Sequence, residues 1–344
     1  MRYLAACGAL AVAWAFWSSA AVDQTGRALA DSSPPAAPPS QAQAVDPADW
    51  GGDHIDQPLP EFMTGSECLF CHRRDVGPTW DKNRHGQTVR RVTADTDILQ
   101  VLRAEPATLE VAKQVEFVLG SRRQVRFLKR GPKYGQLSLL TTSATPKSAA
   151  KQQRLTHAEH PRWDAAKFGK NCAGCHASGL DSRTDAFTAV SLDCFTCHGD
   201  ITLEHTRDSR KALLAKQRHD PPRVVVSICG QCHIRSGRSR STGRRFANNF
   251  VAGDNLFRDL KLDWSSDGLE SLEPVERHIM ENVRDVVLRG RTDMDCRACH
   301  DVHRQSTVKH RTLSDGLICR NCHQVDGSLK GDLRKPRHSR VCEY

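Results

Sequence analysis

The sequence CAGCH at Cys172–His176, followed by CFTCH at Cys194–His198, determines how the chain folds. Each segment is a C-x-x-C-H motif, the attachment signature of c-type haem. Positions i, i+3 and i+4 lie on the same face of a helical turn. Two thiols can therefore form thioethers with the haem vinyl groups while the adjacent histidine binds the iron as proximal ligand.

The same motif occurs six times in 344 residues and uses twelve of the fourteen cysteines. Zinc sites also use paired C-x-x-C segments, but zinc gives no reason for a histidine directly after every second cysteine. A thioredoxin-like redox pair would occur once, beside a βαβ pattern. We therefore predict six covalently bound haem c groups. The predicted thioether cysteines are Cys68, Cys71, Cys172, Cys175, Cys194, Cys197, Cys229, Cys232, Cys296, Cys299, Cys319 and Cys322. The predicted proximal iron ligands are His72, His176, His198, His233, His300 and His323.

The composition favours a fold built around these cofactors. Only 38% of the residues are hydrophobic and 6% aromatic, which is little for the core of a chain of this length. Six porphyrins would supply the missing apolar surface, so the haem-free chain is not expected to fold. We predict a mainly α and irregular, haem-nucleated multihaem cytochrome c fold, in which motifs only 22 or 23 residues apart hold haems side by side.

A segment without a motif, residues 94–145, separates the first haem motif from the second. Glu105-Pro106 predicts a helix that runs to about Gln114. Short apolar runs between turn residues predict strands at 115–119, 124–129 and 136–142. These strands form a small β-meander insertion near 115–142. A further helix is predicted over Pro274–Arg289.

The N-terminus predicts export. Met1-Arg2 precedes an apolar run from Tyr3 to Val22, and Ala28-Leu29-Ala30 resembles a cleavage site, so residues 1–30 are interpreted as a secretory signal peptide. The alternative is an uncleaved membrane anchor, since about 20 apolar residues can span a bilayer. Residues 31–60 form a Pro/Ala-rich linker, and residues 61–344 form the multihaem domain. The protein is expected in the periplasm or otherwise outside the cytoplasm.

The net charge of +10 does not indicate nucleic acid binding. Without residues 1–30 the charge is +9, and six oxidised haems at roughly −1 each would lower it to about +3. Arginines also bind carboxylates such as haem propionates. The basic segment from Arg235 to Arg245 is a candidate docking site for redox partner proteins, such as a membrane-bound quinol-oxidising or terminal reductase complex. A solvated loop is the alternative.

The remaining histidines are the candidate sixth ligands of the irons. The chain after the signal peptide has ten further histidines and three methionines, which favours bis-His haems. The candidate distal ligands are His85, His205, His303, His157, His160, His278 and His310. If every iron has two protein ligands, the protein only transfers electrons, and this function is favoured over an enzyme. One open haem would instead permit a reaction of a small nitrogen or sulfur compound. A third alternative is a haem-bearing subunit of a larger respiratory complex.

Three segments resemble the multihaem cytochromes related to cytochrome c-554 and hydroxylamine oxidoreductase. They are Cys68–His85, Cys172–His205 and Cys296–His303, and together the resemblance covers roughly residues 61–323. It implies that His85, His205 and His303 are distal ligands. The chain departs from the family pattern at Ser178, where threonine is usual, at Asp200-Ile201, where Pro-Gly is usual, and at Val302, where proline is common. The family includes both electron carriers and enzymes.

The last residues, Cys342-Glu343-Tyr344, match the first three positions of another C-x-x-C-H motif. This pattern predicts a fragment cut within a seventh haem motif. The alternative is an unpaired cysteine.

Overall fold

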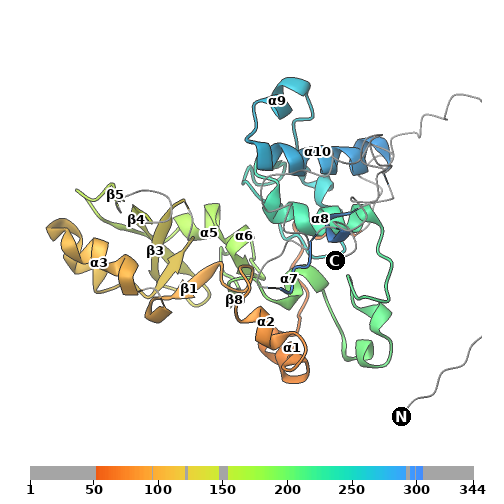
Figure 1. Cartoon of the computed structure of the whole chain (residues 1–344), viewed down its shortest axis with the longest axis horizontal. Coiled ribbons are helices and arrows are strands. Elements are labelled where there is room, and N and C mark those ends of the chain that lie inside the picture. The colour runs from red at the N-terminus through yellow and green to blue at the C-terminus, as the bar shows by residue number, and fades with distance from the viewer. Residues whose placement is uncertain are drawn as a thin grey trace, which may run out of the picture. The chain divides into compact units, whose positions relative to one another are not determined.

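A computed structural model describes residues 52–94, 96–120, 123–146, 154–291, 295–298 and 300–304 (Figure 1). The predicted signal peptide, most of the linker and the segment from 305 onward lie outside these residues. So do Cys299, Cys319, Cys322, His323, His310 and Cys342. In the part of the chain that is described, no helix is both long and apolar enough to cross a membrane.

An antiparallel six-stranded sheet follows the first haem motif. Its path is β1-β2-β3-β4-β5, and β6 pairs with β4. The strands are β1 (Val89–Arg91), β2 (Phe117–Leu119), β3 (Val125–Arg130), β4 (Leu137–Thr145), β5 (Arg154–Thr156) and β6 (Trp163–Asp164). Strands β2, β3 and β4 occupy the three predicted strand segments, and β1, β5 and β6 extend the sheet. The helix predicted over 105–114 is instead the short 3-10 turn η3 (Pro106–Thr108) and the single turn α4 (Leu109–Ala112).

Both faces of the sheet are covered by other residues. Successive side chains of a strand point to opposite faces, so each strand contributes to two apolar clusters. On one face, Val118, Phe127 and Leu140 pack with Leu102 of α3 (Thr96–Ala104). On the other face, the cluster of Leu128, Leu139 and their neighbours includes Phe168 of α5 (Lys167–Asn171) and Ala173 of α6 (Ala173–His176). The sheet therefore supports the helix that carries the second haem motif.

The third apolar cluster joins α10 (Pro274–Arg289) to α8 (Pro222–His233). Met280, Val283 and Val287 of α10 pack with Val226 of α8. Helix α10 has the predicted limits: Pro274 occupies its first turn, and Gly290 ends it in the left-handed conformation with φ 62°. In Figure 1, α10 lies along α8, which carries the fourth haem motif.

The other elements are short. The helices are α1 (Gly65–His72), α2 (Gly77–Trp80), α7 (Cys194–His198) and α9 (Ser266–Glu270). The remaining 3-10 turns are η2 (Val92–Ala94), η4 (Leu203–Thr206), η5 (Ser209–Lys211), η6 (Leu256–Arg258) and η7 (Cys296–Ala298). Two small sheets pair β7 (Ala177–Ser178) with β8 (Ala189–Val190) and β9 (Arg238–Ser239) with β10 (Leu260–Lys261).

Candidate haem-binding site

The first four haem motifs each lie at the C-terminal end of a short helix. The last residues of α1, α6, α7 and α8 are His72, His176, His198 and His233. A local cap begins α7, because the carboxylate of Asp193 accepts a hydrogen bond from the Phe195 backbone N–H at 3.1 Å. In α1, α7 and α8 the helical turn places both cysteines and the histidine of a motif on one face, as thioether attachment with axial ligation requires. In the second motif, Cys172 lies just before α6.

Three pairs of imidazole rings lie at the spacing of two ligands of one iron. The ring centres are 6.3 Å apart for His72 and His205 and 5.9 Å apart for His198 and His303. They are 6.1 Å apart for His233 and His85. A metal–nitrogen bond of about 2 Å and about 1.1 Å from nitrogen to ring centre place opposed rings about 6 Å apart. The ring planes of the first two pairs are 27° and 22° apart and those of His233 and His85 are 70° apart, and the spacing of each pair would accommodate an iron between the rings.

Hydrogen bonds to the second ring nitrogen orient several of these histidines. The Nδ1 atom of His72 lies 3.0 Å from Oδ2 of Asp75, and Nδ1 of His198 lies 2.6 Å from the Leu213 carbonyl oxygen. The Nδ1 atom of His205 lies 2.7 Å from the Thr202 carbonyl oxygen. An Nδ1–H that donates to such an acceptor leaves Nε2 available to a metal and increases its basicity. The hydrogen bond with His72 also lowers the pKa of Asp75.

Each distal candidate from the family resemblance lies opposite the proximal histidine of a motif far from it in sequence. His205 follows the third motif but faces His72 of the first, and His85 follows the first motif but faces His233 of the fourth. His303 is three residues from His300 but faces His198. The histidine pairs are therefore formed by the packing of distant segments.

Two other candidates do not lie opposite a proximal histidine of the described residues. His157 and His160 are exposed after β5, and within the described residues neither contacts another imidazole. His278 lies on α10, where the side-chain amide of Asn282 is 3.2 Å from its Nδ1. His54, for which the sequence predicts no role, has its Nδ1 2.7 Å from the buried carboxylate of Asp254. No sequence signal connects these two residues.

His176 differs from the other three proximal histidines of α1, α6, α7 and α8. No imidazole lies opposite its ring in the segments that the structure describes, and its buried Nδ1 has no hydrogen-bond partner there. Burial, and secondarily the positive charge of Arg235, lowers its pKa to about 4. A neutral imidazole is the form that binds iron.

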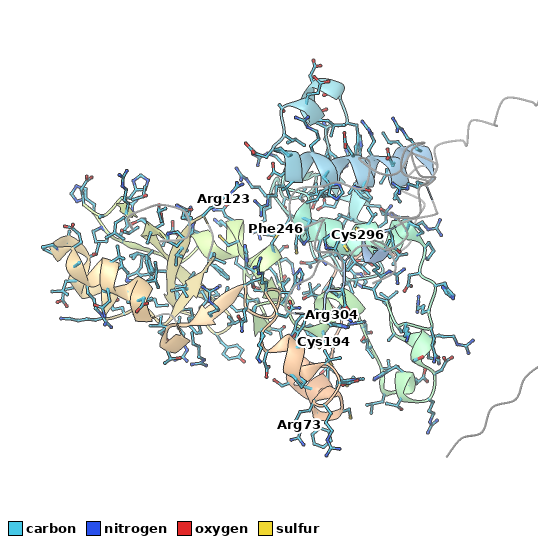
Figure 2. The ribbon with its side chains drawn as sticks, in the orientation of Figure 1. Arg73, Arg123, Cys194, Phe246, Cys296 and Arg304 are labelled. Carbon is cyan, nitrogen blue, oxygen red and sulfur yellow. The ribbon has the colours of Figure 1, made fainter. Side chains whose placement is uncertain are left out.

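Thiols of different motifs lie close together. Three pairs of thiols from different motifs interact by hydrogen bonding: Cys68 with Cys194, Cys175 with Cys232, and Cys229 with Cys296. The hydrogen bond with Cys194 lowers the pKa of Cys68 to about 7. Figure 2 shows Cys194, Cys296 and Phe246 in the helical region, whereas Arg73 lies at the end of α1 and Arg123 at the sheet. Cysteines of different motifs thus lie close together in the helical region, although Cys71 of the first motif is exposed.

The attachment helices α6, α7 and α8 meet at a small cavity of about 40 Å³. Its lining includes one residue from between the cysteines of each of the second, third and fourth motifs, namely Gly174, Thr196 and Gln231. Phe246 also lines it. The Nε2 amide of Gln231 donates hydrogen bonds to the carbonyl oxygens of Thr196 and Ile228, both at 3.1 Å. The bond to Thr196 therefore joins α8 to α7 at this cavity.

Comparison with known proteins finds no matching family model and no matching curated protein. Among solved structures, the chain is similar to the outer cell wall cytochrome OcwA, with 19% identity and a TM-score of 0.46, over 83% of this chain and 67% of that one. It is also similar to the undecahaem cytochrome from the S-layer of Carboxydothermus ferrireducens, with 16% identity and a TM-score of 0.41, over 78% of this chain and 44% of that one. Both TM-scores are below 0.5, so the functional proposal depends on this chain's own residues.

Proposed function

We propose that this protein is an exported multihaem c-type cytochrome that transfers electrons through six covalently bound haems, most of them bis-His. The observation that carries this proposal is the set of three imidazole pairs at 5.9–6.3 Å. In each pair one ring belongs to a C-x-x-C-H motif. When bound, haem supplies one-electron redox chemistry, and bis-His ligation favours a lower potential than Met/His ligation.

The chain's own residues would hold and orient each cofactor. Cysteine pairs supply the thioether links, and the histidine after each pair supplies the proximal ligand. For the first motif, the Asp75 carboxylate and the Thr202 carbonyl oxygen accept from the two opposed imidazoles and fix both ring orientations. Redox function then requires no movement of these side chains.

Partner docking on the basic segment Arg235–Arg245 belongs to the same proposal. Arg238, Arg240 and Arg245 are exposed and could face an acidic redox partner protein, including a subunit of a membrane-bound respiratory complex. Arg244 has a different role, because it forms a 2.8 Å ion pair with Asp185 and its side chain is only 17% exposed. Arg235 also pairs with Glu276 at 3.9 Å, so the proposed docking surface consists of the three other exposed arginines of the segment.

Removal of single distal histidines tests the proposed ligation. The wild-type protein should contain six haems by mass and pyridine haemochrome analysis. His85→Ala, His205→Ala and His303→Ala should each convert one ferric haem from low spin to high spin in electron paramagnetic resonance spectra. His219→Ala is the matched control, because His219 is exposed. A colourless wild-type protein, or three variants with the control's spectrum, would contradict the proposal.

His176, which has no imidazole opposite it among the residues that the structure describes, favours a second candidate function, an oxidoreductase that acts on a small nitrogen or sulfur compound at one open haem. No described imidazole lies opposite His176, and the positive charge of Arg235 lies close enough to lower its pKa. A cyanide titration of the ferric protein separates the two functions: a high-spin wild-type haem that binds cyanide supports the enzyme, and an entirely low-spin protein that does not bind it supports the carrier.

A further inference from the structure

The third position of the C-x-x-C-H motif distinguishes the first motif from those that follow it. In the second, third and fourth motifs this position is Gly174, Thr196 or Gln231, and all three residues line one internal cavity. In the fifth motif it is Ala298, which offers only a methyl group. In the first motif it is Phe70, whose side chain is 88% exposed. Helix α1 therefore presents an aromatic ring to solvent, whereas α6, α7 and α8 meet one another.

The exposed face of α1 is opposite to the face that would bind haem. Positions three or four apart share a face of a helix. Leu69, Phe70 and Arg73 therefore lie on one face, and the cysteines and histidine of the motif lie on the other. These three residues and Gly77 and Pro78 of α2 line an open groove. Haem attachment would leave this groove uncovered.

The first site also lies closer to the surface than the other described attachment sites. Among the motif cysteines that the structure describes, Cys71 is exposed and the others are half-buried. The turn η4 carries His205, which faces His72, and Leu203 in the same turn is 71% exposed. A haem held between His72 and His205 would therefore lie where an electron can reach it from another protein.

The charges around this site favour an acidic partner. Arg73, Arg74 and Arg207 are exposed, and none of them has a carboxylate partner within the described residues. Figure 2 shows Arg73 projecting outward from the end of α1. One carboxylate, Asp81, lines the groove. The other carboxylates of α1, η4 and the residues next to them already have donors in their own segments, namely Glu67, Asp75, Glu204 and Asp208.

We propose that α1, α2 and η4 form a docking surface for an acidic one-electron redox protein, which exchanges electrons with the first haem. Phe70 is the apolar centre of this surface, and Arg73, Arg74 and Arg207 are its charged rim. In the exchange, the partner's reduced cofactor loses one electron and the ferric iron of the first site gains it. The proposal depends on the proposed haem binding and adds a second surface to the basic segment Arg235–Arg245.

Reduced plant-type [2Fe–2S] ferredoxin, an acidic one-electron donor of low potential, is a suitable probe. Stopped-flow measurement of the Soret band gives the second-order rate constant for reduction of the ferric holoprotein. Phe70→Ala should lower this constant about fivefold or more at low and at high salt, because it removes an uncharged contact at the centre of the surface. Arg73→Glu/Arg74→Glu should lower it about tenfold or more at low salt and less at high salt, since salt screens exposed charges.

Matched control variants lie on the sheet. Tyr134→Ala removes an aromatic side chain that is 96% exposed, and Arg123→Glu/Lys133→Glu makes the same change in charge at two exposed positions. Neither control should change the rate constant more than about twofold. Haem content and the ferric spectrum are measured for every variant. The Phe70 and arginine variants act through different interactions, so each tests the surface if the other fails to retain haem.

The proposal is overturned if Phe70→Ala and Arg73→Glu/Arg74→Glu are reduced as fast as their controls, or if Arg238→Glu/Arg240→Glu alone slows the reaction. A loss of rate at both arginine pairs, together with the loss in Phe70→Ala, supports two surfaces. A wild-type dimer that becomes monomeric in Phe70→Ala, measured by sedimentation, would assign the surface to a second copy and overturn the acidic partner. Failure of the proposed function looks different, because the wild-type protein would then have no Soret band.

Discussion

Gly174→Ala perturbs the point at which the attachment helices meet. Gly174 lies on α6 between the two cysteines of the second motif. A Cβ atom added there would lie 2.7 Å from Cδ1 of Phe246 and nearer still to other atoms of that ring. Phe246 is only 3% exposed, so its ring cannot move into solvent without leaving the core.

Two effects of opposite sign determine the size of the change. Alanine in a helix is ordinarily about 0.5–1 kcal/mol more stable than glycine. An added methyl group in a packed interior costs about 1–3 kcal/mol. Since the clash is with a buried aromatic ring, we expect the second effect to dominate and the free energy of unfolding to fall by about 1–2 kcal/mol.

Denaturant unfolding of the holoprotein, followed by circular dichroism and Soret absorbance, measures this loss. Gly77→Ala is the matched control, because the nearest atoms to its added Cβ lie at 3.7 Å, an ordinary contact. Phe246→Leu removes the ring. In this background, Gly174→Ala should lower the free energy of unfolding by less than it does in the wild-type protein. A Gly174→Ala protein as stable as wild type, or an identical cost in both backgrounds, would refute the packing argument.

Three further outcomes are expected. Gln231→Ala removes one buried and one partly buried hydrogen bond and should lower the free energy of unfolding by about 1–3 kcal/mol in urea titrations, whereas Gln100→Ala at an exposed position should change it little. Burial raises the pKa of Asp259, but hydrogen bonds from Ser239, Asn248 and Ser241 outweigh burial and leave the pKa below its ordinary 3.8. The carboxylate therefore stabilises the fold above pH 3.8 and loses this effect as the pH falls through its folded-state pKa. Asp259→Asn should cost about 1.5–3 kcal/mol at pH 7, and a pH series of unfolding curves should show this difference narrowing below pH 3.8. Expression without haem attachment should give a chain that circular dichroism and small-angle scattering report as unfolded, and a compact apo-protein would contradict this expectation.

Local patterns predicted much of the secondary structure and the proposed attachment residues. The C-x-x-C-H spacing depends only on helical geometry within five residues, so the proposed proximal ligands and thioether cysteines could be named without a fold. Helix α10 begins at Pro274 and ends at Arg289 as predicted, because proline and glycine act on the backbone next to them. The helix expected to extend to Gln114 ends at Ala112 after a 3-10 turn, and the residues that follow lead into β2.

The tertiary structure decided which residues face one another. Family resemblance selected His85, His205 and His303, but neither it nor chain spacing indicated the proximal histidine opposite each one. His303 shows the reason: it is three residues from His300, yet its ring lies 5.9 Å from that of His198. Covalent spacing fixes which atoms a short segment can present. Only the packing of distant segments determines which of those atoms meet, and therefore which ligands and which motifs are neighbours.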